Sequence, residues 1–340
     1  EEGVALMCLA EALLRIPDAQ TRDDLIYEKL QEGNWKSHIG NSNSFFINAA
    51  SYGLLFGKKI SETLDENSLS NALTRSFSRL SAPIMRMAII KSMQILGKQF
   101  VTGVTMQEAL QNIKPRYEKG FTFSFDMLGE AAMTEADAQR YFNDYLHAIE
   151  EVGKDAAGRT IYNGNSVSVK LSAIHPKYSR SKYDRTINEL YPRLKELFLL
   201  AKKYNISINI DAEEASRLEL SLDLVEKLLD EPELQGYKGI GFVVQAYSKR
   251  CPFVLDYLIN LAREKQGYLM IRLVKGAYWD SEIKWAQVDG MNGYPVYTRK
   301  VHTDVSYLAC ARKLLEAQDA VFPQFATHNA YTLACIYNFG

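Results

Sequence analysis

Polar side chains that could act on a ligand gather at the ends of short apolar segments in the second half of the chain. The most specific segment is residues 272–279, where Arg272 and Lys275 lie in an apolar run and Gly276 precedes two aromatic residues. A buried cation is costly unless it meets an anion, and a glycine lets the backbone approach a ligand closely. The segment therefore favours a large, planar, anionic ligand, with a salt-bridged strand end as the alternative.

Three carboxylates follow another apolar run, at Asp211, Glu213 and Glu214. Such a set could bind a metal, exchange protons with a substrate, or cap the next helix. A helix cap is the simpler interpretation of Glu213 and Glu214, whereas Asp211 lies on the predicted strand itself. Because no histidine accompanies these carboxylates at a metal-binding spacing, no metal site is predicted.

Lys170 ends a third apolar run and has three interpretations. It could form a Schiff base with a carbonyl substrate, bind a substrate carboxylate, or make an ion pair with Asp211 or another neighbour. His328, next to Thr327, could donate a hydrogen bond to a phosphate or a carbonyl group. Residues 294–300 lie in a long connection of the kind that often packs over a cofactor.

The elements that position these groups alternate between β-rich and helical patterns from about residue 121. Strands are predicted at residues 121–127, 166–172, 206–211, 239–245, 268–274 and 324–327, and helices at 134–152, 185–204, 215–230, 252–265 and 305–318. This alternation indicates βαβ units and a parallel sheet. The polar groups follow the strands, as in a (β/α)8 barrel, and the first strand lacks the glycine-rich turn of a doubly wound sheet.

We therefore predict an α/β fold of the (β/α)8-barrel type, preceded in the chain by an all-helical N-terminal domain. Residues 1–115 have helical periodicity, for example in the ranges 69–80 and 85–96, and Thr105 with Glu108 predicts a capping box for a helix at 106–113. The barrel is assigned to residues 116–340. Only six strands are found, so we expect the closing strands and the last helix to be absent from this chain.

Composition and charge narrow the classes of partner and location. The net charge of −1 gives no electrostatic case for nucleic acid or an anionic membrane, so no nucleic-acid partner is predicted. No segment approaches the roughly 20 apolar residues that span a bilayer. The four cysteines are scattered, which fits a reducing cytoplasm. The absence of an initiator methionine at Glu1 suggests a piece of a longer protein.

Taken together, several segments resemble the proline dehydrogenase domain of the bifunctional proline-utilisation flavoenzymes (PutA). The segments are SVKLSAIHPKYSR (168–180), NIDAEEASRLELSLDL (209–224), VVQAYSKR (243–250), IRLVKGAYWDSEIKWAQ (271–287), GYPVYTRKVHTDVSYLACARKLL (293–315), ATHNAYTL (326–333), FDMLGEAA (125–132) and GNWKSHIG (33–40). The resemblance spans nearly the whole chain, and its motifs are long and occur in the same order.

The resemblance implies FAD over the strand ends and oxidation of L-proline to Δ1-pyrroline-5-carboxylate. A hydride would pass from proline C5 to flavin N5, and the electrons would pass on to a membrane quinone. The implied catalytic residues are Asp211 and Arg272, with Arg272 near N5. The proline pocket would comprise Lys170, Asp211, Tyr278 and Glu130. The residues implied to contact FAD are Ala212, Gln245, Arg272, Val274, Lys275, Gly276, Ala277, Trp279, Thr298, Thr327 and His328.

The family pattern continues into a helix with paired arginines that bind the substrate carboxylate, and this helix is not in the sequence. Two alternatives stay open: a flavin-free barrel lyase that uses Lys170 as a Schiff base, and an FAD-binding fragment that is inactive because it lacks these arginines. The resemblance also implies an aldehyde dehydrogenase domain in the parent chain and a cytoplasmic location, with the parent protein peripheral to the inner membrane. It is compatible with a homo-oligomer.

Overall fold

A computed structural model describes Thr21 and residues 101–340. The helical patterns predicted at 69–80 and 85–96, and the segment at 33–40, lie outside these residues. The chain divides into two compact units, Glu1–Ile113 and Lys114–Gly340. Helix α5 (Met106–Tyr117) begins after Thr105, whose hydroxyl accepts the backbone N–H of Glu108 at 3.2 Å, as the capping pattern predicts. It extends four residues beyond the predicted end.

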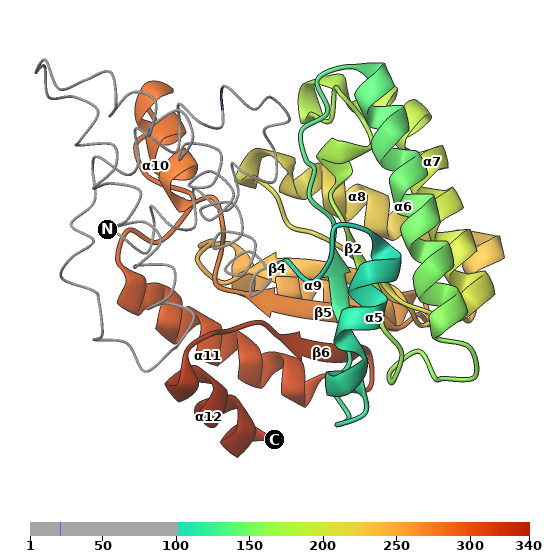
Figure 1. The fold of residues 1–340 in the computed structure, drawn as a ribbon. Helices are drawn as coiled ribbons and strands as arrows, with labels where there is room; N and C mark the ends of the chain where they lie inside the picture. The colour runs from blue at the N-terminus through green and yellow to red at the C-terminus, as the bar shows by residue number, and fades with distance from the viewer. Residues whose placement is uncertain (1–20, 22–100) are drawn as a thin grey trace, which may run out of the picture. The chain divides into compact units, whose positions relative to one another are not determined.

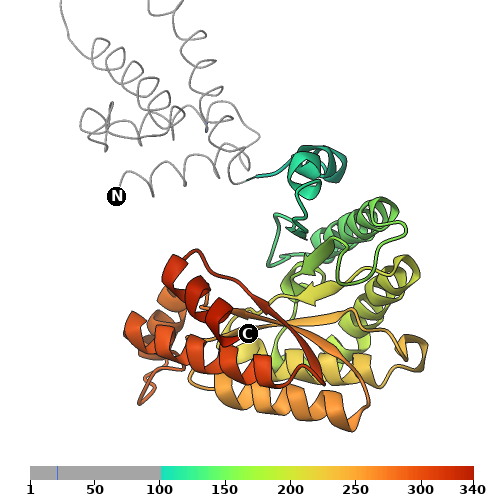
Figure 2. The same ribbon diagram turned by 90° about the horizontal axis from the view of Figure 1, so that it is seen from below.

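Six parallel strands form one sheet in chain order, and each pairs with the next: β1 (Ser124–Asp126), β2 (Ser166–Val169), β3 (Ile208–Ile210), β4 (Ile240–Gln245), β5 (Leu269–Val274) and β6 (Val321–Phe325). Figures 1 and 2 show this sheet curled, with helices along its outer side. An in-order parallel sheet with helical crossovers is the arrangement of a (β/α)8 barrel. The predicted fold is therefore confirmed, with six strands among the described residues.

The strands are connected by the helices α6 (Glu135–Asp155), α7 (Tyr183–Tyr204), α8 (Leu218–Leu229), α9 (Cys251–Glu264), α10 (Trp279–Val288) and α11 (Lys300–Glu316), and α12 (Ala330–Phe339) follows β6. Thr134 starts α6 with a capping box, because its hydroxyl accepts the Asp137 N–H at 3.1 Å. Five of these helices were predicted to within five residues at each end. The sequence analysis did not predict α10.

Two of the differences between the predicted and the observed strand limits have local reasons. The second strand ends at Val169 because residues Leu171–Ala173 turn into a 3-10 helix. The sixth strand covers Val321–Phe325 instead of residues 324–327. It includes Pro323, which a sequence pattern treats as a strand breaker but which is tolerated at a sheet edge. Gln324 lies in both the predicted and the observed strand, and the register of the β5–β6 pair places it next to Arg272.

Side chains alternate between the two faces of the curled sheet. Those that face the helices are apolar, and Val167, Ile208 and Leu273 are fully buried there. The opposite, interior face carries Ser168 and its register partner Asn209, together with Arg272. Barrel interiors are usually filled by branched apolar side chains. A polar interior is a departure from the packing rule, and such departures mark functional regions.

Replacing Gly241 with alanine is expected to destabilise the fold by about 1–3 kcal/mol, which is typical of overpacking. A Cβ atom there would lie 2.3 Å from Asn209 Oδ1 and 2.7 Å from the Ile208 carbonyl oxygen, so neighbouring backbone has to move. Denaturant unfolding measures the change. Gly293→Ala is the matched control, because nothing lies within 4 Å of its added Cβ. Equal stability of the two variants would contradict the packing described.

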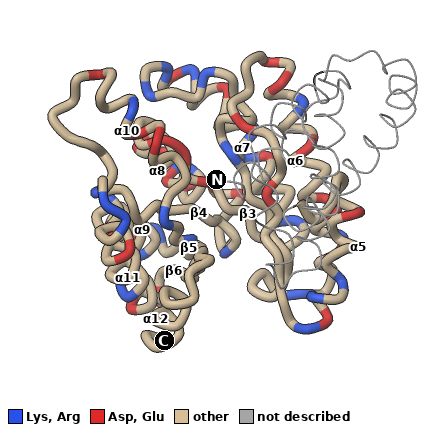
Figure 3. The backbone as a smooth tube through the Cα atoms, turned by 60° about the vertical axis from the view of Figure 1, so that its left-hand side comes forward, with Lys and Arg blue, Asp and Glu red and all other residues tan. Residues whose placement is uncertain are grey.

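Basic and acidic residues both occur along the described elements (Figure 3). Among the helices that the structure describes, none combines the length and the apolar character that a membrane crossing requires.

Candidate active site

An ion-pair cluster lies at the carboxyl ends of β1, β2 and β3. The Lys170 ammonium nitrogen lies 2.6 Å from Asp126 Oδ1 and 3.0 Å from Asp211 Oδ2. The side chains of Lys170 and Asp211 are each 15% exposed, whereas that of Asp126 is 58% exposed. The structure thus contains the ion pair that was one of three interpretations of Lys170, and it adds Asp126 as a second partner.

The surroundings fix the charge states of this cluster. Burial opposes the charge on Lys170, but the neighbouring Asp211 and Asp126 carboxylates outweigh it and raise the pKa of its ammonium group. Burial also raises the pKa of the Asp211 carboxyl group, although Lys170 and Arg272 act in the opposite direction. Lys170 is therefore a cation suited to binding a carboxylate, and Asp211 is a stronger base than an exposed aspartate.

The Arg272 side chain extends from β5 across the interior of the curled sheet to β1 and β2. Its Nη1 donates to Ser168 Oγ at 2.8 Å, its Nη2 to Ser124 Oγ at 2.6 Å, and its Nε to Gln324 Oε1 at 3.2 Å. Nη1 also lies 3.9 Å from Asp211 Oδ1, which connects the guanidinium to the ion-pair cluster. The predicted residues Lys170, Asp211 and Arg272 are thus brought together.

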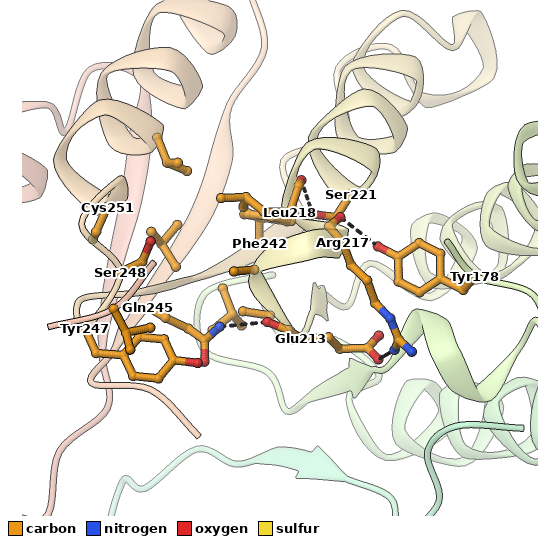
Figure 4. A pocket seen from close by; sticks show the side chains of 16 residues that line it. Tyr178, Glu213, Arg217, Leu218, Ser221, Phe242, Gln245, Tyr247, Ser248 and Cys251 are labelled. Carbon is orange, nitrogen blue, oxygen red and sulfur yellow. Dashed lines mark hydrogen bonds and ion pairs between the residues drawn. The ribbon is translucent and has the colours of Figure 1, made fainter. Parts of the chain in front are cut away.

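The second carboxylate of the β3 loop supports the end of β4. Glu213 is buried, and its side chain accepts hydrogen bonds from the Ser172 N–H at 3.0 Å and from Arg217 at 2.6 Å. Gln245 donates to the Glu213 carbonyl oxygen at 2.9 Å and accepts the Ala277 N–H at 3.2 Å. Figure 4 shows Gln245, Glu213 and Arg217 in this chain of contacts. Glu213 is therefore a buried structural anchor, and it does not fit the helix-cap interpretation.

Tyr278 and Glu130, two of the four residues predicted for the substrate pocket, approach each other. The Tyr278 hydroxyl lies 3.5 Å from Glu130 Oε2, across 148 residues of sequence. Tyr278 is half-buried and Glu130 is exposed. Their contact brings the loop after β1 next to the loop after β5, at the same edge of the sheet as Lys170.

The residues predicted to contact the cofactor are spread over the carboxyl edge. Lys275 pairs with Asp304 at 2.5 Å, so its charge already has a partner. Gly276 has a φ of 139° and an exposed backbone, and Ala277 after it is exposed too. The Trp279 indole donates to the Tyr297 carbonyl oxygen at 2.9 Å.

The remaining predicted contacts lie around these groups. Ala212 is half-buried beside Gln245, and Val274 ends β5. Thr298 and His328 are exposed, and the Thr327 hydroxyl accepts the Asn329 N–H at 3.0 Å just before α12. The connection that carries Thr298 packs on the turn after β4, where Ser248 and Val296 form an antiparallel bridge.

Comparison with known proteins identifies the family. A model described as "Proline dehydrogenase" matches residues 109–340, more than half of the chain. The chain belongs to the proline dehydrogenase family. A second model, described as "DNA-binding domain of Proline dehydrogenase", matches residues 1–100, which lie almost entirely outside the described residues. This description is at odds with the expectation of no nucleic-acid partner, which rested on the net charge of the chain.

The relatives include longer proteins. Bifunctional protein PutA of Klebsiella aerogenes is 63% identical over 337 residues, covering 99% of this chain and 26% of that protein. Proline dehydrogenase 1 of Bacillus subtilis is 26% identical over 185 residues, covering 54% of this chain and 53% of that protein. The chain therefore spans about a quarter of the length of the PutA relatives, and its likeness to the shorter dehydrogenases covers about half of it.

Solved structures agree with these relatives. A mutant of Bradyrhizobium japonicum proline utilization A (PutA) is 44% identical, with a TM-score of 0.71 over 99% of this chain and 34% of that chain. Proline utilization A from Bdellovibrio bacteriovorus, inactivated by N-propargylglycine, is 28% identical, with a TM-score of 0.71 over 95% of this chain and 36% of that chain. The described fold is thus the fold of this proline dehydrogenase family.

Four residues of this cluster were not predicted from the sequence: Ser124, Asp126, Ser168 and Gln324. Asp126 pairs with Lys170, and the other three bind Arg272. Strand alternation could have found one of them, because Ser168 lies two residues before Lys170 and therefore faces the same side. The others required the register between distant strands, which the sequence does not contain.

Lys170 of this family member is expected to form no Schiff base. A Schiff base requires a neutral amine, and the two carboxylates keep Lys170 protonated. Borohydride treatment in the presence of a carbonyl compound such as pyruvate, followed by peptide mass mapping, should therefore find Lys170 unmodified. An exposed lysine such as Lys300 reports whether the reagent worked. An adduct on Lys170 would revive the flavin-free lyase.

Proposed function

We propose that this chain carries the FAD-dependent oxidation of L-proline to Δ1-pyrroline-5-carboxylate, with the electrons passing on to a quinone. The observation that carries the proposal is the cluster of Lys170, Asp211 and Arg272 at one edge of the barrel sheet, in a chain of the proline dehydrogenase family. The cluster pairs two cations, Lys170 and Arg272, with the carboxylates of Asp211 and Asp126, and such a set of both charges suits an amino-acid substrate beside an anionic cofactor.

The residues at this edge fit a zwitterionic substrate. The Lys170 ammonium would bind the proline carboxylate, and Tyr278 with Glu130 would border the pocket. Hydride loss from C5 requires the lone pair of the proline nitrogen, which is protonated in water. Asp211 would take that proton, since burial raises its pKa and makes it a better base. The positive field of Lys170 and Arg272 keeps it ionised until then.

The chemistry of the donors at this edge also fits FAD. Arg272 places a cation on the interior face of the strand ends, and Gly276 and Ala277 present an exposed backbone just after β5. FAD would supply the N5 atom that accepts the hydride. The residues that would hold it are Ala212, Gln245, Arg272, Val274, Lys275, Gly276, Ala277, Trp279, Thr298, Thr327 and His328.

The whole protein is proposed to resemble the PutA relatives, of which this chain covers about a quarter. The parent chain would then include an aldehyde dehydrogenase domain that consumes the product. We propose that the parent protein acts in the cytoplasm and associates peripherally with the inner membrane, where it reduces a quinone.

A visible absorption spectrum of the purified chain, before and after anaerobic addition of L-proline, tests the proposal. A flavin spectrum that L-proline bleaches is expected, and prior treatment with N-propargylglycine should abolish the bleaching. A flavin spectrum that persists with proline would favour the inactive FAD-binding fragment. A chain that stays colourless after reconstitution with FAD would overturn the proposal.

A further inference from the structure

The contacts of the Arg272 guanidinium form an ordered set. Ser168 on β2 and Ser124 on β1 each accept one of its terminal NH2 groups, at 2.8 and 2.6 Å. The two hydroxyl oxygens lie 3.3 Å apart and form a hydrogen bond with each other. Ser168 is buried, and it lies two residues before Lys170 on the same face of β2. The serine pair, Ser124 and Ser168, thus holds a cation that originates on β5, three strands from β2 and four strands from β1.

The serine hydroxyls that accept hydrogen bonds from Arg272 are neutral, so they do not neutralise its positive charge. A guanidinium normally pairs with a carboxylate in a two-bond fork. Here Asp211 Oδ1 lies 3.9 Å from Nη1, beyond hydrogen-bond distance, and Asp211 Oδ2 is engaged by Lys170 at 3.0 Å. The serine pair satisfies the donors of Arg272 while keeping it apart from Asp211. The positive charge of Arg272 consequently remains available to a ligand at the strand ends.

We propose that Ser124 and Ser168 are positioning residues, which hold Arg272 at the edge of the sheet where the flavin would bind and prevent its collapse onto Asp211. This inference rests on the proposed function. Without the hydroxyls, the guanidinium would move to Asp211 and form a closed pair. Two consequences follow: less positive charge would act on the reduced cofactor, and the Asp211 carboxylate would be a weaker base.

The reduction potential of the bound flavin tests the proposal in Ser168→Ala and Ser124→Ala chains. Loss of one hydrogen bond to a charged group predicts about a tenfold fall in the equilibrium constant for flavin reduction, or about 30 mV for a two-electron couple. Ser166→Ala is the matched control. Ser166 lies on the same strand and face, and the described hydrogen bonds of Arg272 do not include its hydroxyl. Ser124→Thr, which retains a hydroxyl, should restore the potential.

A double-mutant cycle of Ser168→Ala with Arg272→Met, measured by unfolding of the apoprotein, separates this inference from the proposed function. The two changes in the free energy of unfolding are expected to be non-additive, because each variant removes the same hydrogen bond between Arg272 and Ser168. If the chain takes up no flavin, the proposed function fails. The double-mutant cycle then still tests whether Ser168 and Arg272 interact. Additive effects, or a potential in Ser168→Ala that equals or exceeds that of Ser166→Ala, would overturn the positioning role.

Discussion

Replacing Asp211 with asparagine is expected to lower kcat/KM for L-proline by about 10²–10⁴-fold, the range that a positioned proton acceptor contributes. Asparagine keeps the shape of the side chain and accepts a hydrogen bond from Lys170, but it cannot take the proton from the substrate nitrogen. Steady-state kinetics with an artificial electron acceptor measure the change. Glu214→Gln, on the same loop, is the matched control, because Glu214 pairs with Arg217 and lies outside the proposed pocket.

The pH dependence of the same reaction gives a second readout. Burial raises the pKa of Asp211, so its active carboxylate form is lost at a higher pH than for an exposed aspartate. The acid limb of kcat/KM should therefore lie above the ordinary range of aspartate, and it should disappear in Asp211→Asn. An unchanged turnover across pH in the variant would remove the proton-accepting role and leave Asp211 as a partner of Lys170.

Replacing Arg272 with methionine is expected to lower kcat by about 10²–10³-fold, the loss found when one donor at a site of developing charge is removed. Methionine fills the same interior volume without a charge. The potential of the bound flavin should fall as well, because the positive charge favours the reduced cofactor. Stopped-flow reduction by L-proline measures the chemical step directly, without contributions from reoxidation.

Two further variants make the Arg272 result specific. Arg272→Lys retains the charge but cannot bond both serines in a fork, so intermediate kinetics are expected. Arg263→Met removes an arginine whose partner is Asp319 on the outside of the barrel, and its kinetics should match the parent chain. Equal flavin reduction rates in Arg272→Met and the parent chain would show that the cation does not act on the chemical step.

The barrel was predictable because its pattern is strong and repeated. Each strand is a short apolar run followed by polar groups, and this arrangement indicates both parallel strands and the edge at which the site forms. Lys170, Asp211 and Arg272 were found from that arrangement together with the family resemblance. Their approach within one cluster follows from the in-order sheet, which places β2 next to β3 and brings β5 round to face them.

What could not be predicted depends on pairing across the sheet. Ser124 and Gln324 look like ordinary polar residues until the register places them beside Arg272. Helix α10 was missed because Trp279–Val288 follows directly on the motif that was assigned to the ligand, where a loop was expected. Asp126 was missed because its partner Lys170 lies on the neighbouring strand, and only the register between β1 and β2 brings the two side chains together.

The contact of Arg272 with Ser124 spans 148 residues of sequence and joins β5 to β1. Contacts of such separation form late, because the chain must lose the entropy of closing a long loop before they can stabilise it. A single βαβ unit folded early during synthesis would bury its own apolar face but could not hold this guanidinium. The site is built from opposite sides of the barrel. During refolding, catalytic activity should therefore return more slowly than secondary structure.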